Sequence, residues 1–427
     1  MAGVGLLVAR LQGNITTSEI RVSEVDVPDS SKGVNILVLG SDSRDSESAS
    51  FGTNTGTQRS DSMLLVHLSA DNQRIDAVQI PRDTVIQLPA CEDTGSGAYA
   101  GGRGMINSAL NYGPACSVAA VEALTDVHVN HFIMLDFEGF ISIVDAMDGI
   151  KVCLATPLVD SKAKLDLPAG QQTLGGYDAL ALARTRHAIG DGSDIARLGN
   201  QQMVMSAIVQ RATSKEVLSR PDRLYSFLDA TTSSMTVDRG LSSIADLTSL
   251  AARVQAVPTD QITFMTMPNQ PAPENPNRVV PSEDAYVIFD RIAQGNPVKL
   301  TTDKPTEDTA EASSPDATLP FTIVNGARVN GLAAQFAQSA ADQGFTNSSI
   351  TTAATAADKT QLLIPDDVDA QKFATALAQA LELKIKPVAS DVETTQLILG
   401  QDYLSLVKTP EKEVKATSRN ANQSLCG

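Results

Sequence analysis

The chain has 427 residues, of which 42% are hydrophobic and 19% charged, so it is long enough for two or more domains with substantial cores. Its formal net charge of −17 argues against a nucleic-acid-binding protein, since such proteins present a basic face. Tryptophan is absent and aromatic residues make up 4%, so stacking platforms for sugars or bases would be sparse.

The N-terminal segment, residues 1–33, begins with MAGVGLLVARLQGNI. Its apolar run Val4–Ala9 is far shorter than the roughly 20 residues that cross a bilayer. Two interpretations remain open: a short frayed terminus, or the end of a membrane helix that begins outside this numbering.

The next region, 34–295, alternates strand-like and helical patterns, which is typical of an α/β domain. Apolar, β-rich runs predict strands at 35–40, 63–68, 75–80 and 149–154. Apolar residues at helical spacing or helix-forming composition predict helices at 117–124, 137–147, 178–184, 200–211 and 241–257. The glycine-rich stretch 94–104 lacks the Lys-Ser/Thr of a phosphate-binding P-loop, and it predicts a flexible loop.

Composition changes sharply after Ile292. Residues 296–318 are rich in Thr, Pro, Asp and Glu and contain no aromatic residue, so we expect a disordered linker. Strand and helix patterns resume over 319–408, which predicts a small α+β domain, and 409–427 is left as a tail. No cluster of Asp and Arg comparable to that of the first domain follows the linker.

The four cysteines are Cys91, Cys116, Cys153 and Cys426, and none has the CxxC spacing of a metal site. An even count favours two disulfides and an oxidising compartment over buried free thiols. Only a loop and a helix start separate Cys91 from Cys116, so this pair is favoured, with Cys153 as an alternative partner for either.

Four short patches in the first half of the chain combine acidic and basic residues. They are NILVLGSDSR (35–44), RSDSM (59–63), QIPRDT (79–84) and RTRHAIGDGSDIAR (184–197). The first three border predicted strands, and functional groups of open α/β sheets collect at such edges. We therefore expect these patches to converge on one site through Asp42, Arg44, Asp61 and Arg82.

Two carboxylates beside several arginines predict a metal ion held against a polyphosphate, because Mg²⁺ shares its shell with substrate phosphates. The alternative is that Asp42 and Asp61 only cap turns, and that Arg82 and Asp83 form a surface pair. The last patch is harder to explain in that way. Its three guanidinium groups repel one another unless an anion or carboxylates lie among them, which favours an anion site.

Taken together, the patches resemble the LytR–CpsA–Psr family of cell-envelope glycopolymer transferases. The matching pieces follow the family's order over about 34–209: GSDSR, RSDSM, IPRDT, INSALNYG, HFIMLDFEGF, QTLGGYDALALARTR and GDGSDIARLGNQQ. The pieces FTIVNGARVNGLAAQFAQSAADQGF and LILGQDY resemble the LytR-type C-terminal domain often appended to actinobacterial members.

The resemblance implies a three-layer α/β/α domain with a mixed central sheet, enclosing an apolar groove for a polyprenyl chain, followed by a small α+β domain. It implies a Mg²⁺ ion, or Mn²⁺, held by Asp42 and Asp61. The catalytic residues that it implies are Arg82, Arg184, Arg186, Asp194 and Arg197. The substrate-binding residues that it implies are Arg44, Arg59, Asp83, Asn107 and Gln201.

One position departs from the family pattern: Met105 stands where the family often has Lys, with Arg103 as the candidate substitute. The general base is not identified, and Asp83 and Asp194 are the candidates.

The function implied by the resemblance is a phosphotransferase. It would move a glycopolymer, arabinogalactan or teichoic-acid-like, from a polyprenyl-pyrophosphate carrier onto peptidoglycan, with pyrophosphatase as an accompanying activity. The protein would lie at the extracytoplasmic face of the cell membrane, held by an N-terminal anchor mostly missing from this numbering. The alternatives are a ligase that attaches glycan to a surface protein and a non-catalytic assembly protein that binds lipid pyrophosphate or wall material.

Overall fold

A computed structural model describes residues 2–20, 30–41, 58–161, 163–185, 194–300, 319–328, 332–353, 355–381, 383, 385–402 and 414–423. The chain forms two compact units, and the first contains segments from both ends. The first unit comprises residues 1–301 and 413–427, and the second comprises 302–412.

The first unit is built on an eight-stranded mixed sheet. In spatial order its strands are β1 (Thr16–Ser18), β12 (Met235–Asp238), β7 (His131–Leu135), β2 (Val34–Ser41), β3 (Ser60–Leu68), β4 (Ile75–Ile80), β13 (Ile262–Thr266) and β21 (Ser418–Asn420). β3 is antiparallel to both β2 and β4, whereas β7 runs parallel to β2 and β13 parallel to β4. The predicted mixed central sheet is confirmed.

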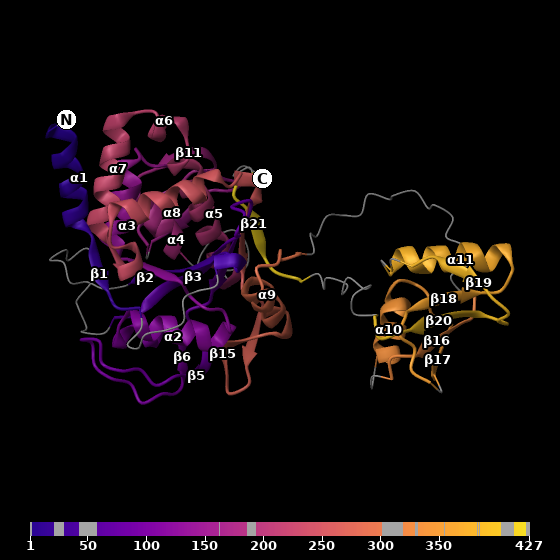
Figure 1. Ribbon diagram of the computed structural model, residues 1–427. Coiled ribbons are helices and arrows are strands. Elements are labelled where there is room, and N and C mark those ends of the chain that lie inside the picture. The colour runs from indigo at the N-terminus through magenta and orange to yellow at the C-terminus, as the bar shows by residue number, and fades with distance from the viewer. Residues whose placement is uncertain are drawn as a thin grey trace. The chain divides into compact units, whose positions relative to one another are not determined.

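Helices cover both faces of this sheet, which gives the three layers (Figure 1). The upper layer consists of α3 (Phe137–Ala146), α4 (Gly176–Arg184), α5 (Asp194–Ala212), α7 (Pro221–Ser234) and α8 (Ile244–Ala256). The lower layer consists of β5 (Val85–Leu88), β6 (Gly102–Met105), the 3₁₀ helix η3 (Ile106–Tyr112), α2 (Pro114–Thr125) and α9 (Glu283–Ala293).

Strand alternation explains how one sheet serves two cores. On β3, Met63 and Leu65 belong to the lower core, whereas the intervening Leu64 packs with Phe264 in an upper one. Every residue of the central strand β4 is buried. Around this framework lie short elements: η1 (Ser30–Lys32), β8 (Ile150–Leu154), β9 (Leu158–Asp160), β10 (Leu165–Leu167), β11 (Gly170–Leu174), α6 (Lys215–Leu218), η4 (Arg239–Leu241), η5 (Thr259–Gln261), β14 (Asn269–Ala272) and β15 (Asn275–Pro281).

The predicted strands and helices of this unit are present, with shifted ends. α2 begins three residues earlier than expected, at Pro114, because proline suits the first turn of a helix. The stretch predicted to be a flexible loop contains β6, which pairs with β5, and a further bridge between Cys91 and Tyr99.

The disulfide between Cys91 and Cys116 is confirmed, with their Cα atoms 5.5 Å apart. It ties the segment after β5 to the first turn of α2, beside the stacked rings of Tyr99 and Tyr112. Cys153 is also disulfide-bonded and does not take the place of either partner. Cys426 lies outside the described residues.

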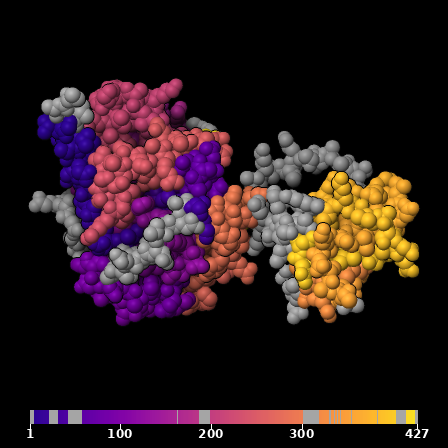
Figure 2. Space-filling model, in the orientation of Figure 1, coloured from indigo at the N-terminus to yellow at the C-terminus, as the bar shows by residue number. Residues whose placement is uncertain are grey.

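The N-terminal segment forms a helix, α1 (Ala2–Asn14), that packs against α7 and α8, as the indigo surface of Figure 2 shows. Arg10 forms an ion pair with Asp229 on α7 at 2.9 Å, and Leu11 is buried. Leu6, by contrast, is 73% exposed. Among the described residues, no helix has both the length and the apolar character needed to cross a bilayer.

The C-terminal segment was expected to be a tail, and this was wrong for residues 414–423. They include β21, which pairs antiparallel with β13 at the edge of the main sheet, because the open hydrogen-bonding edge of β13 accepts a short strand. The expected linker falls mostly on 301–318, outside the described residues.

In its described residues, the second unit has a five-stranded sheet and two helices of its own. The strands, in spatial order, are β17 (Ser348–Thr352), β16 (Phe321–Asn325), β20 (Thr395–Leu399), β18 (Gln361–Ile364) and β19 (Pro387–Ala389). The helices are α10 (Leu332–Asp342) and α11 (Val368–Ala380). Phe373 of α11 packs against Phe321 and Phe345 in the centre of this separate core.

Candidate functional site

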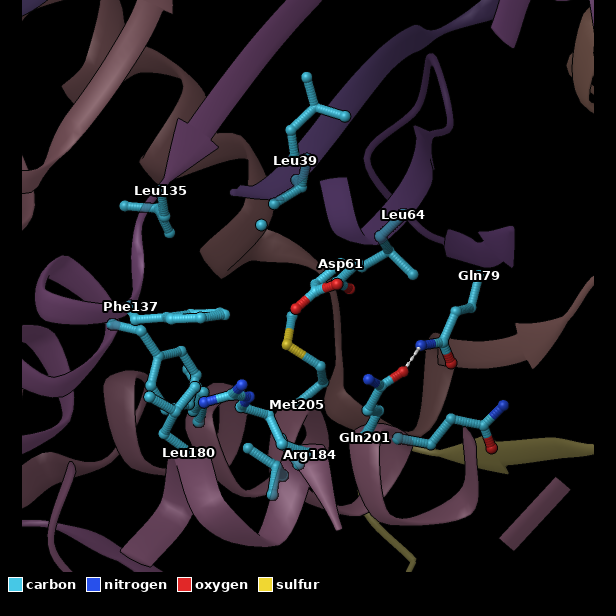
Figure 3. A pocket seen from close by; sticks show the side chains of 18 of the residues that line it. Leu39, Asp61, Leu64, Gln79, Leu135, Phe137, Leu180, Arg184, Gln201 and Met205 are labelled. Atoms are coloured by element: carbon cyan, nitrogen blue, oxygen red, sulfur yellow. Dashed lines mark hydrogen bonds between the residues drawn. The ribbon is translucent and has the colours of Figure 1, made fainter. Parts of the chain in front are cut away.

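A cavity of about 200 Å³ lies between the sheet and three helices of the upper layer, α3, α4 and α5 (Figure 3). Most of its lining is apolar: Val38, Leu39, Leu64, Leu135, Phe137, Phe140, Ile143, Val144, Leu180, Ala183, Val204, Met205, Ile208, Phe264 and Met265. Its polar side chains are Asp61, Ser62, Gln79, Asp136, Arg184, Gln201 and Gln202. An apolar space bordered by charge suits an amphiphilic ligand with an ionic head group.

The sheet supplies one charged pair at this cavity. Asp61 is the second residue of β3, close to the irregular pairing between Gly40 and Ser41 on β2, and Arg82 follows β4 directly after Pro81. The Arg82 Nη1 atom lies 2.5 Å from Asp61 Oδ1, and each side chain is 24% exposed. The structure thus joins two of the sequence patches at one strand edge.

Asp83 is held by two guanidinium groups. Its Oδ1 accepts a hydrogen bond from Arg278 Nη1 on β15 at 3.0 Å, and its Oδ2 lies 3.9 Å from Arg82 Nε. The turn itself is fixed because Thr84 Oγ1 donates a hydrogen bond to the Pro81 carbonyl at 2.6 Å. Asp83 therefore adds a fixed negative charge beside Arg82.

The helices supply the facing side of the site. Arg184, the last residue of α4, places its guanidinium 4.5 Å from the centre of the Phe137 ring, a cation–π contact. Phe137 begins α3, whose start is capped by Asp136 accepting a hydrogen bond from Gly139 N at 2.7 Å. Figure 3 shows Asp61, Arg184 and Gln201 surrounding one space from three different elements.

A glutamine pair links the sheet to α5. The Gln79 side chain on β4 donates a hydrogen bond to the side chain of Gln201, drawn as the dashed line in Figure 3. Gln201 was expected to bind substrate, and the structure places it on the cavity wall. The amide groups leave both donors and acceptors there for a polar head group.

The other predicted site residues fall into three groups. Arg59 is exposed just before β3, and Asn107 is buried in η3, where its Oδ1 has no hydrogen-bond partner among the described residues. Asp194 and Arg197 belong to the first turn of α5, but their side chains are not described. Three further residues lie outside the described ranges: Asp42, Arg44 and Arg186.

Of the two proposed metal ligands, Asp61 lies within the described residues. Within the described ranges, no group of three or more His, Cys, Asp or Glu side chains could hold a metal ion. Asp61, paired with Arg82 and partly exposed at the cavity, fits a magnesium ion that takes few protein ligands and completes its shell with phosphate and water.

Three contributors were missed from the sequence. Phe137 lies in the quoted piece HFIMLDFEGF and Gln79 in QIPRDT, so both were within reach as aromatic and amide side chains at strand edges. Arg278 gave no such signal, because its pairing with Asp83 depends on β15 folding back from almost two hundred residues away.

Fold and cavity define a class of protein: an α/β/α domain with an apolar cavity between its sheet and one helical layer, bordered by charged side chains. The comparisons identify the family. Residues 9–295 match the LytR_cpsA_psr family, and the chain belongs to it. Residues 318–403 match the domain described as LytR cell envelope-related transcriptional attenuator.

Curated relatives share part of their length with this chain. The cell wall biosynthesis protein LcpA of Corynebacterium glutamicum is 30% identical over 264 residues, which cover 55% of this chain and 49% of LcpA. The polyisoprenyl-teichoic acid–peptidoglycan teichoic acid transferase TagU of Bacillus cereus is 31% identical over 225 residues, covering 52% of this chain and 65% of TagU. The chain spans about half the length of the first of these relatives.

A solved structure supports the fold. The LytR-Csp2A-Psr enzyme from Actinomyces oris superposes with a TM-score of 0.52 at 24% identity, covering 65% of this chain and 96% of that one. The three-layer architecture described above is therefore that of a LytR–CpsA–Psr domain.

Proposed function

We propose that this protein is a phosphotransferase that moves a glycopolymer from a polyprenyl-pyrophosphate carrier onto peptidoglycan during cell-wall assembly. The observation that carries the proposal is the apolar cavity lined by Arg184 and by Asp61, whose carboxylate is paired with Arg82. The names of the relatives support it, since TagU is named for a transfer of teichoic acid from a polyisoprenyl carrier to peptidoglycan.

In the proposed reaction, a hydroxyl oxygen of peptidoglycan attacks the phosphorus that carries the glycan. The expected hydroxyl is that on C6 of N-acetylmuramic acid. The bond from this phosphorus to the bridging oxygen breaks, and polyprenyl phosphate leaves with the electron pair. The hydroxyl proton passes to a base, for which Asp194 is the stronger candidate, because Asp83 is already shared between Arg82 and Arg278.

Each side chain has a defined task in this proposal. Arg82, Arg184, Arg186 and Arg197 neutralise charge on the phosphoryl oxygens, the term that usually dominates phosphoryl transfer. Gln201 and Gln79 orient the head group, and Phe137 with its apolar neighbours holds the first isoprene units. Asp42 and Asp61 would hold Mg²⁺ or Mn²⁺, which would supply further charge neutralisation.

The cavity in this structure is too small for a whole polyprenyl chain. Its volume of about 200 Å³ lies below the roughly 300–1,000 Å³ typical of small-molecule pockets. The proposal therefore requires α3, α4 or α5 to move outward when a long polyprenyl chain enters. Attachment to the membrane at the extracytoplasmic face belongs to the same proposal, since the donor is a membrane lipid.

The test is to incubate the full chain with Mg²⁺ and a polyprenyl-pyrophosphate-linked disaccharide, with and without peptidoglycan fragments. Mass spectrometry should find a phosphodiester-linked product only when acceptor is present. Release of free sugar phosphate without acceptor would indicate the pyrophosphatase activity. An unchanged donor under both conditions, with the protein shown to be folded, would contradict the proposal.

A further inference from the structure

Residues 414–423, called the closing segment below, follow the second unit in the sequence but belong to the first unit. The two passages of the chain meet at one point, where Val414 N donates a hydrogen bond to the Lys299 carbonyl at 3.0 Å. The second unit is therefore inserted in the first. The fold of the first unit is completed by residues that follow the second unit in the sequence.

The closing segment is built into both layers of the first unit. Val414 is completely buried in the core of the lower layer, and Ala421 is completely buried in an upper core with Ile262 and Phe264. Between them, β21 pairs residue by residue with β13, and hydrogen bonds continue past both ends of the strand. The segment is therefore anchored in a core at Val414 and at Ala421, while β21 between them is exposed or half-buried.

The same segment also fastens α5, the helix that carries Gln201. Gln202 is buried, and its Nε2 donates hydrogen bonds to Thr266 Oγ1 on β13 at 3.0 Å and to the Thr417 carbonyl at 3.4 Å. Further along the helix, Gln210 Nε2 donates a hydrogen bond to the Ala421 carbonyl at 2.5 Å. One face of α5 is thus fixed to the closing segment at two places, about two turns apart.

We infer that the closing segment positions the cavity wall, and that Gln202 is a positioning residue that sets the rotation of α5. With Gln202 fixed to Thr266 and Thr417, the preceding residue Gln201 is directed to Gln79 and the cavity. The inference rests on the proposed function, since it assigns the segment a role in holding a polyprenyl pyrophosphate. It makes residues beyond the second unit part of the site.

The experiment uses the full chain and farnesyl pyrophosphate as a soluble probe, with binding measured by titration calorimetry and unfolding followed in urea. Gln202→Ala removes both contacts and should weaken binding about three- to tenfold, the effect of about one lost hydrogen bond. Gln210→Ala is the matched control, since it removes a contact between the same helix and segment at a residue that does not line the cavity. It should lower the urea midpoint similarly and change binding less than twofold.

Thr266→Val provides a second test that preserves side-chain shape, and it should weaken binding in the same direction by less than Gln202→Ala. With the polyprenyl-linked donor, Gln202→Ala should raise KM more than it lowers kcat. Because Gln202 itself lines the cavity, Thr266→Val is the deciding variant: binding equal to that of the unaltered protein would overturn the positioning role even if Gln202→Ala binds more weakly. The positioning role would also be overturned if Gln202→Ala, Thr266→Val and Gln210→Ala all lost affinity in proportion to the fall in their urea midpoints. Absence of binding by the unaltered protein would instead overturn the proposed function, and this inference with it.

Discussion

The two layers that cover the main sheet are made from similar residues but differ in how they are filled. Below the sheet, Leu37, Met63, Val78, Phe132 and Phe289 are buried to within 1% in one continuous core. Above it, α3, α4 and α5 leave a cavity of about 200 Å³ that reaches charged side chains. The lower layer is also fastened by a disulfide.

From this difference we infer that the lower layer mainly provides stability and the upper layer mainly binds the ligand. A filled core gains dispersion contacts and loses water, so it contributes stability. An apolar cavity gives up part of this stabilisation. We expect a protein to keep such a cavity when a ligand fills it and restores the lost contacts. The lower layer would then fix the sheet, so that Asp61 and Arg82 stay in place while the helices above adjust to the lipid.

The largest expected effect is at the charged pair that the sheet supplies beside the upper cavity. Arg82→Ala removes the guanidinium beside Asp61 and should lower kcat about 10²- to 10³-fold, the usual cost of losing one group that neutralises transition-state charge. Asp61→Ala should lose activity to a similar extent while the fold is preserved, since Asp61 lies outside the cores. Initial rates with the polyprenyl-linked donor provide the measurement.

A matched control lies in the lower layer. Arg103 pairs with Glu274 in an ion pair whose arginine side chain is 55% exposed, so Arg103→Ala should change activity and stability little. A large loss of activity in Arg103→Ala would show that the lower layer also contacts substrate, which would break the division proposed here and support Arg103 as the substitute for the missing family lysine.

The second effect is on stability. Replacing both Cys91 and Cys116 by serine opens a loop with a sequence separation of 25 residues and should lower the free energy of unfolding by roughly 3 kcal/mol. Because the bridge lies in the lower layer, affinity for farnesyl pyrophosphate should remain within about twofold of the unaltered protein. Urea unfolding measures the change in stability, and calorimetric titration measures the change in affinity at the upper cavity. Weaker binding in proportion to lost stability would show that the layers are coupled.

Much of this architecture could be predicted from the sequence. Apolar runs such as those of β3 and β4 identify strands, because a strand that is covered on both faces needs apolar side chains on both. The motif pieces identify the family. The pairing of Asp61 with Arg82 follows from strand ends meeting at one edge. The Cys91–Cys116 bridge was predicted from a short separation and confirmed.

The remainder depends on packing between distant segments, which local patterns do not contain. Nothing in the periodicity of α3 or α5 distinguishes a helix over a cavity from a helix over a filled core. The closing segment looked like a tail because Ser418–Asn420 is short and polar, and its place is set by the free edge of β13. For the same reason, truncation after the first 295 residues, which would look harmless from the sequence, removes part of two cores.

A third prediction compares the layers directly by adding volume to each. Ala183→Leu projects into the cavity from α4 and should raise the Kd for farnesyl pyrophosphate severalfold without loss of stability, since space is available there. Ala120→Leu adds the same atoms to the filled lower core, where overpacking should cost about 1–3 kcal/mol and leave binding unchanged. Equal destabilisation by both changes would mean that the upper cavity is not open space.

The smallest expected effect is a pH dependence from the sheet itself. His67 on β3 is completely buried, and its Nδ1 lies 2.7 Å from Asn35 Oδ1, a contact in which the ring nitrogen donates. Burial, with a smaller contribution from the charge of Arg74, lowers the pKa of His67 from 6.5 to about 4. The folded protein therefore favours the neutral ring, whereas the unfolded chain takes up a proton below pH 6.5.

The stabilisation from neutral His67 is fully present above pH 6.5 and is lost as the pH falls toward 4. Between pH 7 and pH 5.5 this amounts to roughly 1 kcal/mol of unfolding free energy. His67→Asn retains a polar group near Asn35 but does not titrate, so its urea midpoint should change less over this range. Asp76, whose pKa is raised by burial, has an opposite dependence but is present in both proteins, so their difference isolates the histidine. An identical pH slope in the two proteins would show that His67 is protonated in the fold at little cost.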